Sequence, residues 1–184
     1  MKETKDCIIP FRTYTDGVHD ITFTIGNSFF EAIENSLIQK GHITVNVQMT
    51  KSQQMLKLHF QLNGIITVPC DVCLEDMDYP INNCEGNMVV KFGQQTEEIS
   101  DELFQLNENE NEISVSQWIY EILAVSLPIK FVHPTDANGN PTCDPEMLSR
   151  LSKYLVTDED IQTVSKDEDG IDPRWAALKK LKDK

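Results

Sequence analysis

The sequence lacks the short motifs that mark several large enzyme classes. It has no His-Glu-x-x-His motif, no Gly-x-Ser-x-Gly turn and no glycine-rich phosphate loop. The four histidines are scattered, and the abundant carboxylates form no recognisable catalytic pair. His59 falls on the polar side of an alternating stretch, where an exposed imidazole is expected rather than a catalytic one. We therefore expect a protein that is not an enzyme.

Long apolar runs are also missing. No stretch reaches the roughly 18 apolar residues that a membrane span needs. The charged start of the chain and the short apolar run that ends at Pro10 do not match a secretory signal peptide. We expect a cytoplasmic protein with no membrane partner. Thiols stay reduced in that compartment, so the five cysteines favour burial or metal binding over a disulfide framework.

Basic residues are scarce. The chain has 16 Lys and Arg against 30 Asp and Glu, and its formal net charge is −14. Such a chain repels a phosphate backbone as a whole, so any contact with nucleic acid must be local. The acidic surface either serves solubility or attracts a basic partner such as a ribosomal protein.

Alternating apolar and polar residues indicate strands. Residues 43–49 and 56–62 alternate strictly, which predicts a long antiparallel hairpin with one face in water. Gly64 predicts a bulge or bend, after which the strand continues to Val68. Shorter strands are predicted at 8–11, 21–25 and 88–92.

Two capping-box patterns predict helices. The first, Ser28-Phe29-Phe30-Glu31, begins a helix whose residues Phe29, Ile33 and Leu37 share one face and which ends near Gly41. The second begins at Ser114 and starts the main core helix, which ends at Leu127 before a proline. A short helix is also predicted around 148–151.

The remaining segments are polar and irregular. Residues 93–112 are rich in Glu, Asn and Gln, which predicts a solvated acidic loop with a turn near Leu103. Residues 131–143 contain Pro and Gly, which predicts a second loop. The fold class that we predict is α+β, with an antiparallel, strongly curved or barrel-like sheet, one main packed helix and a flexible C-terminal tail. The domain covers residues 1–156, and residues 157–184 form an acidic linker with a short basic helix.

Cys70 and Cys73 stand three positions apart in a turn between two predicted strands. This spacing allows one turn to present two sulfurs to a single metal ion. A structural zinc site needs two further ligands, and His133 and Cys143 in the 131–143 loop are the candidates. Cys84 is an additional candidate ligand.

Two other interpretations of the cysteine pair remain open. Cys70 and Cys73 could be ordinary small apolar residues at a strand end. They could also form a dithiol–disulfide couple, although a thioredoxin-like motif places its first cysteine at the start of a helix, and none is predicted here. Cys7 suggests no function.

The C-terminal segment 172–184 differs from the rest of the chain. It begins with a helix-start signal at Asp172-Pro173, and five basic residues against two acidic ones give it a net charge of +3. We predict a partner-binding element, and the alternative is a clamp that docks onto the acidic face of its own domain. The expected partner-binding residues are Arg174, Trp175, Leu178, Lys179 and Lys180.

Four segments of the chain occur in an order that resembles the YceD family of large ribosomal RNA subunit accumulation proteins. They are Pro69-Cys70-Asp71-Val72-Cys73-Leu74-Glu75, then Ile122-Leu123-Ala124-Val125-Ser126-Leu127-Pro128, then Cys143, and finally Asp172-Pro173-Arg174-Trp175-Ala176-Ala177-Leu178-Lys179-Lys180-Leu181. The resemblance covers roughly residues 40–184. Many relatives carry a second thiol pair after the Leu-Pro helix end, where this chain has His133 and Cys143.

The resemblance implies a non-enzymatic factor that supports accumulation or processing of large-subunit ribosomal RNA. The expected function is that of a ribosome-assembly accessory protein, which binds RNA or protein of a large-subunit precursor. A thiol oxidoreductase that uses Cys70 and Cys73 is one alternative. A zinc-stabilised adaptor unrelated to the ribosome is another. Zinc is the cofactor candidate.

Overall fold

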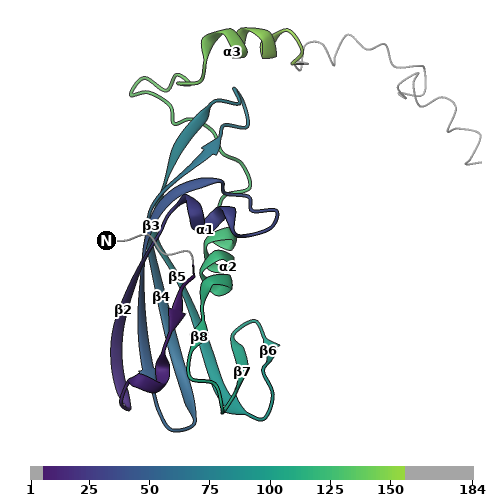
Figure 1. Cartoon of the computed structure of the whole chain (residues 1–184). Coiled ribbons are helices and arrows are strands. Elements are labelled where there is room, and N and C mark those ends of the chain that lie inside the picture. The colour runs from purple at the N-terminus through teal and green to yellow at the C-terminus, as the bar shows by residue number, and fades with distance from the viewer. Residues whose placement is uncertain (1–5, 156–184) are drawn as a thin grey trace, which may run out of the picture.

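The computed structural model describes residues 6–155, which form a six-stranded sheet, a separate two-stranded sheet and a few short helices (Figure 1). The main sheet has the strand order β2-β3-β4-β5-β7-β6. Its strands are β2 Gly17–Ile25, β3 Lys40–Lys51, β4 Met55–Pro69, β5 Asp76–Gly93, β6 Glu97–Ser100 and β7 Leu103–Asn107. The other elements are β1 Ile8–Ile9, β8 Ile113–Ser114, the 3-10 helix η1 Phe11–Thr13, and the helices α1 Asn27–Glu31, α2 Ser116–Ser126 and α3 Pro145–Ser152.

The α+β class and the mostly antiparallel sheet are confirmed, but the strongly curved or barrel-like shape is wrong. A barrel needs its first and last strands to pair. Here β2 and β6 are the two edges of an open sheet, and β1 pairs with β8 in a sheet of its own. Within the described residues only β5 and β7 run parallel.

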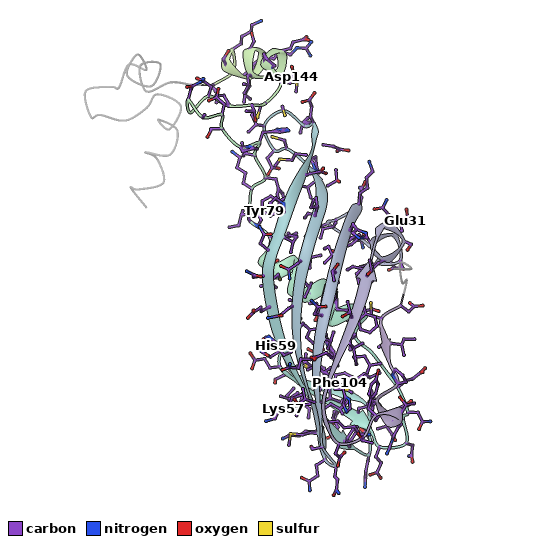
Figure 2. All side chains as sticks on the ribbon, turned by 90° about the vertical axis from the view of Figure 1, so that its left-hand side faces the viewer. Glu31, Lys57, His59, Tyr79, Phe104 and Asp144 are labelled. Carbon is purple, nitrogen blue, oxygen red and sulfur yellow. The ribbon has the colours of Figure 1, made fainter. Side chains whose placement is uncertain are left out.

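The long hairpin of β3 and β4 follows the predicted alternation. Its register runs from Lys40 opposite Thr67 to Lys51 opposite Leu56. The face of the hairpin turned away from the core is polar and carries Lys57 and His59 (Figure 2). On this face His59 Nδ1 lies 2.8 Å from Asn87 Oδ1. The buried face carries Ile43, Val45, Val47 and Met49 from β3 and Leu56, Leu58, Phe60 and Leu62 from β4.

Gly64 marks the predicted bulge, but the extra residue belongs to the neighbouring strand. Leu62 of β4 pairs with Cys84 of β5, and Gly64 pairs with Ile81, so that one residue between the pairs in β4 faces two residues in β5. Glycine is required at position 64 because a Cβ there would lie 2.2 Å from the carbonyl oxygen of His42. The bulge changes the alternation of β5, so that the buried residues are odd-numbered before it and even-numbered after it.

Helix α2 covers the apolar face of the sheet (Figure 1). It begins at Ser116, two residues after the predicted start, and the Ser114 side chain does not cap it. Gly86 of β5 lets the helix approach, because a Cβ at that position would lie 2.5 Å from the Ile122 side chain. The residues that α2 buries are Trp118, Ile119 and Leu123.

The first predicted helix is much shorter than expected. Helix α1 ends at Glu31, and its N-cap is Gly26 rather than Ser28. The expected apolar face does not extend along it, since Leu37 is 73% exposed while the neighbouring Ile38 is fully buried. The chain turns after α1 and buries Ile38 in the hydrophobic core. This tertiary packing overrides the helix that the four-residue spacing of Phe29, Ile33 and Leu37 predicted.

The segment 93–112 contains strands β6 and β7, so the prediction of an acidic loop is wrong there. Strand β7 lies between β5 and β6. Leu106 is buried, and the Phe104 ring packs edge-on against Trp118 at 5.2 Å. These long-range contacts stabilise a strand whose local composition favours disorder.

Strand β5 is also much longer than the short strand predicted at 88–92. It includes Pro80, which pairs with Ile65 of β4. Proline is tolerated at this position because β7, the other strand paired with β5 in the described residues, contacts it only from Val89 to Gly93. No helix within residues 6–155 combines the length and the apolar character that crossing a membrane would need.

Candidate metal centre

The cysteine pair lies in a tight turn between β4 and β5. The Cys70 backbone N–H donates to the carbonyl of Glu75 at 2.9 Å, and the Leu74 N–H donates to the carbonyl of Cys70 at 2.9 Å. Leu74 has a φ of 64°, the left-handed conformation that reverses the chain. The turn leads directly into β5 and not into a helix. The two sulfurs, Cys70 Sγ and Cys73 Sγ, lie within 4.8 Å of each other.

The loop that follows α2 is held against this turn by two hydrogen bonds, one between backbone groups and one to a side chain. The Asp71 N–H donates to the carbonyl of Phe131 at 2.8 Å, and the Phe131 N–H donates to the Asp71 carboxylate at 2.6 Å. The Phe131 ring also packs edge-on against Tyr79 of β5 at 5.2 Å. These contacts place the next residues of the loop, including His133, over the cysteine turn.

A small hairpin then returns the chain to the turn. Thr135 and Pro141 form an isolated antiparallel bridge, and the Asp136 carboxylate accepts hydrogen bonds from the backbone N–H groups of Asn138 and Asn140 at 2.8 Å. The Thr142 hydroxyl closes the base of the hairpin on the carbonyl of Pro134. His133 and Cys143 stand at the two ends of this hairpin and so lie side by side.

The structure brings the four predicted ligands together. Their ligand atoms all lie within 4.8 Å of one another, slightly wider than the separation of about 4 Å expected around one zinc. The three cysteines are buried and the imidazole is half-buried. The close contacts are Cys70 Sγ–Cys143 Sγ at 3.8 Å, Cys73 Sγ–His133 Nδ1 at 3.4 Å and Cys143 Sγ–His133 Nδ1 at 3.7 Å.

These separations fit a tetrahedral zinc site. Zinc–sulfur bonds of about 2.3 Å and zinc–nitrogen bonds of about 2.1 Å place neighbouring ligands about 3.5–3.8 Å apart. Three thiols and one imidazole are also a donor set that zinc prefers. The Cys3His cluster, defined as Cys70, Cys73, His133 and Cys143, could therefore bind a metal.

The thiols of the cluster differ in acidity. Burial raises the pKa of Cys70, but hydrogen bonds from the backbone of Cys73 and Val72 and from His133 outweigh it, so that the pKa falls to about 6. Burial, hydrogen bonds with Cys70 and Cys73, and the charge of these two groups together raise the pKa of Cys143 to about 11. Cys70 is thus mainly a thiolate at neutral pH, which is the form that binds a metal.

The other cysteines lie outside the cluster. Cys84 is buried, and its thiol donates to the carbonyl of Ile122 at 3.4 Å, so that it anchors α2 on β5. Cys7 is also buried, and its backbone N–H donates to the Ser116 hydroxyl at 2.9 Å. The predicted partner-binding residues Arg174, Trp175, Leu178, Lys179 and Lys180 lie outside the described residues.

Sequence analysis missed the residues that align the two halves of the site. Asp71 stands between the two cysteines, and its carboxylate holds the chain at Phe131 rather than serving as a ligand. Asp136 and Gly139 define the hairpin turn, and an Asp-x-x-Gly pattern within a Pro/Gly loop was the available signal.

Comparison with known protein families matches residues 58–182 to the family described as "Large ribosomal RNA subunit accumulation protein YceD". No curated protein and no solved structure matches the chain. The matched region begins in β4, includes every residue of the Cys3His cluster and extends through most of the basic C-terminal segment. Since it covers more than half of the sequence, the chain belongs to the YceD family.

Proposed function

We propose that this chain is a cytoplasmic accessory factor of ribosome assembly, which supports accumulation or processing of large-subunit ribosomal RNA by binding a precursor particle. The family match over residues 58–182 carries this proposal. A binding role also agrees with the Cys3His cluster, which supplies all four positions of a closed metal site and leaves none for a substrate.

The metal that we propose for the cluster is zinc in a structural role. Bound zinc would supply a cross-link, without redox chemistry, between the β4–β5 turn and the loop from Phe131 to Cys143. The residues themselves already hold the two segments in register through Asp71. Helix α3 begins directly after Cys143, where Asp144 accepts hydrogen bonds from the first turn. The cluster thereby fixes the start of α3.

The precursor contacts that we propose are in the C-terminal segment. Arg174, Lys179 and Lys180 would meet phosphates or an acidic protein surface, while Trp175 and Leu178 would supply an apolar anchor. A local basic element is needed because the chain as a whole carries a charge of −14.

Sucrose-gradient sedimentation of a cell extract tests the proposal. The full chain should co-migrate with precursors of the large subunit and shift to the top of the gradient when those precursors are depleted. Co-migration with small-subunit precursors would contradict the assignment. Sedimentation as a free protein under every condition would instead favour the zinc-stabilised adaptor.

A thiol oxidoreductase is the second candidate, because Cys70 has a pKa of about 6. The geometry of the turn is less favourable to it, since no helix follows Cys70 to stabilise a thiolate through its dipole. An insulin-reduction assay decides between the assembly factor and the thiol oxidoreductase. The parent protein should show no turnover, and Cys73→Ser should therefore lose none. Measurable turnover in the parent that Cys73→Ser abolishes would support the oxidoreductase.

A further inference from the structure

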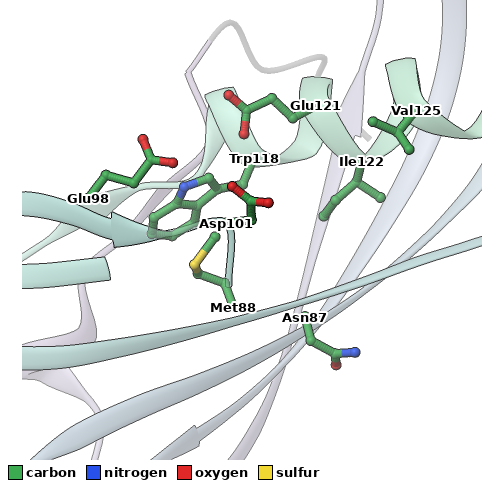
Figure 3. Close-up of a pocket in the computed structure, with 8 residues that line it drawn as sticks. All are labelled: Asn87, Met88, Glu98, Asp101, Trp118, Glu121, Ile122 and Val125. Carbon is green, nitrogen blue, oxygen red and sulfur yellow. The ribbon is translucent and has the colours of Figure 1, made fainter. Parts of the chain in front are cut away.

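A groove of about 380 Å³ lies between α2 and the strands β5 and β6 (Figure 3). Its floor is apolar: Trp118 and Met88 are largely buried, and Ile122 lies beside them. Val125 extends this apolar surface along α2 and is 87% exposed. The volume is in the lower part of the range of binding pockets and suits one or two large side chains.

The rim of the groove is acidic. Glu98 comes from β6, Asp101 from the β6–β7 turn and Glu121 from α2, and Figure 3 shows these carboxylates around the Trp118 ring. All three side chains are exposed. Among residues 6–155 no lysine or arginine forms an ion pair with them. An apolar floor within three carboxylates is complementary to a basic segment with an apolar anchor.

The sequence contains such a segment at its C-terminal end. Residues 172–184 carry a net charge of +3 in a chain whose total is −14. If they form the helix that their sequence predicts, Trp175 and Leu178 share one face, with Lys179 following on its flank. A helix this short is marginal alone in water and gains stability when its apolar face is covered.

The linker is long enough to reach the groove. The groove residue Met88 lies twelve residues after Asp76, the first residue of β5, which is about 40 Å at the rise of a strand. Helix α3 and the residues beside it add at most about 18 Å between Cys143 and the start of the linker. The 20 residues from 156 to Trp175 span up to about 65 Å when extended, which exceeds the sum of these two distances. Six carboxylates against one lysine in residues 156–171 favour extended conformations by mutual repulsion.

We infer that the C-terminal segment 172–184 of this chain docks in the groove between α2 and β6, with Trp175 on its apolar floor and the lysines against Glu98, Asp101 and Glu121. The inference concerns the chain alone and holds whether or not the proposed function is correct. If a ribosomal precursor contacts the same C-terminal segment, the groove and the precursor compete for that segment. In the free protein, the groove then covers the apolar side chain of Trp175.

Carbodiimide cross-linking of the full chain at low concentration tests this inference, because the reagent joins carboxylates only to lysines in contact with them. Mass spectrometry of the monomer should find Lys179, Lys180 or Lys182 joined to Glu98, Asp101 or Glu121, and 1 M salt should abolish these products, since it shortens the Debye length to about 3 Å. Products confined to carboxylates outside the groove would overturn the inference, and so would groove products found only in cross-linked dimers.

A charge exchange provides the matched control. Glu121→Lys should strongly reduce cross-linking of the segment to Glu98 and Asp101, and adding Lys179→Glu and Lys180→Glu should restore contact through the new lysine at position 121. Glu31→Lys makes the same charge change on α1 and should leave the products unchanged. If Glu121→Lys and Glu31→Lys reduced the cross-linked products equally, only the total charge of the domain would matter, and the assigned groove would be wrong.

Discussion

Cys70 and Cys143 lie 3.8 Å apart but differ by several pKa units in acidity. The difference arises because backbone donors surround Cys70, whereas Cys143 faces its neighbouring sulfurs in a buried position. A single metal ion would remove this contrast by binding both as thiolates. At the scale of single residues the cluster therefore predicts two measurable effects.

The first effect is on the pH dependence of stability without metal. The pKa of Cys70 is depressed to about 6 from an ordinary 9, so its contribution is present above pH 9 and is lost as the pH falls through 6. The pKa of Cys143 is raised to about 11, so its contribution is present below pH 9 and is lost as the pH rises through 11. Their sum is therefore greatest near pH 9.

Denaturant unfolding of the metal-free protein between pH 6 and pH 11 measures this dependence. The free energy of unfolding of Cys70→Ser, subtracted from that of the parent, should leave a difference that grows from pH 6 to pH 9. Cys84→Ser serves as the control, because Cys84 lies outside the cluster. A difference for Cys70→Ser that does not vary with pH would contradict the assigned acidity.

The second effect is on metal content. The purified chain should bind one zinc per molecule, and Cys143→Ser should lower its affinity by at least about tenfold, because a structural site needs all four ligands. Cys84→Ser removes another buried thiol and should keep the full zinc content. Metal analysis and competition with a chromophoric chelator measure both values. Equal affinity in the two variants would exclude Cys143 as a ligand.

The elements of the fold differ in how well the sequence predicted them. Strands β3 and β4 were predictable because one face of the hairpin is buried and the other is exposed. Apolar and polar residues therefore alternate along both strands with a period of two. Helix α1 and strand β7 were not, because contacts distant in sequence decide them. Burial of Ile38 in the core prevents the helix from continuing after α1. The Phe104 side chain of β7 packs against Trp118 of α2, which is distant in sequence.

The same contrast applies to the candidate site. Its ligands were predictable, since two cysteines three apart and a later His and Cys form a pattern visible in one sequence. Their alignment was not, because Asp71 acts through the backbone of Phe131, sixty positions later, and nothing local marks such a pair. The continuity of β5 through Pro80 escaped prediction for a related reason, since it depends on which edge of the strand is unpaired.

Close packing of α2 against β5 gives a prediction at the scale of elements. Gly86→Ala places a methyl group 2.5 Å from Ile122 and should lower the free energy of unfolding by about 1–3 kcal/mol through overpacking. Adding Ile122→Val makes room for the methyl group and should recover part of this loss. Thermal and urea unfolding of the three variants measure the coupling. Additive losses in the double variant would mean that Ile122 is not the obstacle.

At the scale of the whole molecule, the two tryptophans should contribute to different properties. Trp175→Ala should weaken association with ribosomal precursors and lower the melting temperature only slightly, because Trp175 contributes a docking contact and the domain is predicted to end before residue 157. Trp118→Ala is the control, since Trp118 is 8% exposed and its truncation should destabilise the protein by about 3 kcal/mol or more. A comparable loss from Trp175→Ala would place the C-terminal segment in the core.

Limited proteolysis gives an independent measure of the same division. Cleavage between residues 157 and 170 should release the basic segment and leave a folded fragment whose melting temperature is lower only by the small contribution of the docked segment. Precursor binding should then be lost. Retained binding by the fragment would move the partner surface onto the described domain.

The pairing of β1 with β8 has a consequence for how the chain acquires its structure during synthesis. Ile8 pairs with Ser114, and the backbone of Cys7 depends on the hydroxyl of Ser116. Strand β1 leaves the ribosome before the other described strands, and therefore has no partner until more than a hundred further residues have been translated. Closing so long a loop is entropically costly, so β1 should dock after the β3–β4 hairpin has formed. Until then the apolar N-terminal residues are exposed, and nascent chains at this stage are where a chaperone would be needed.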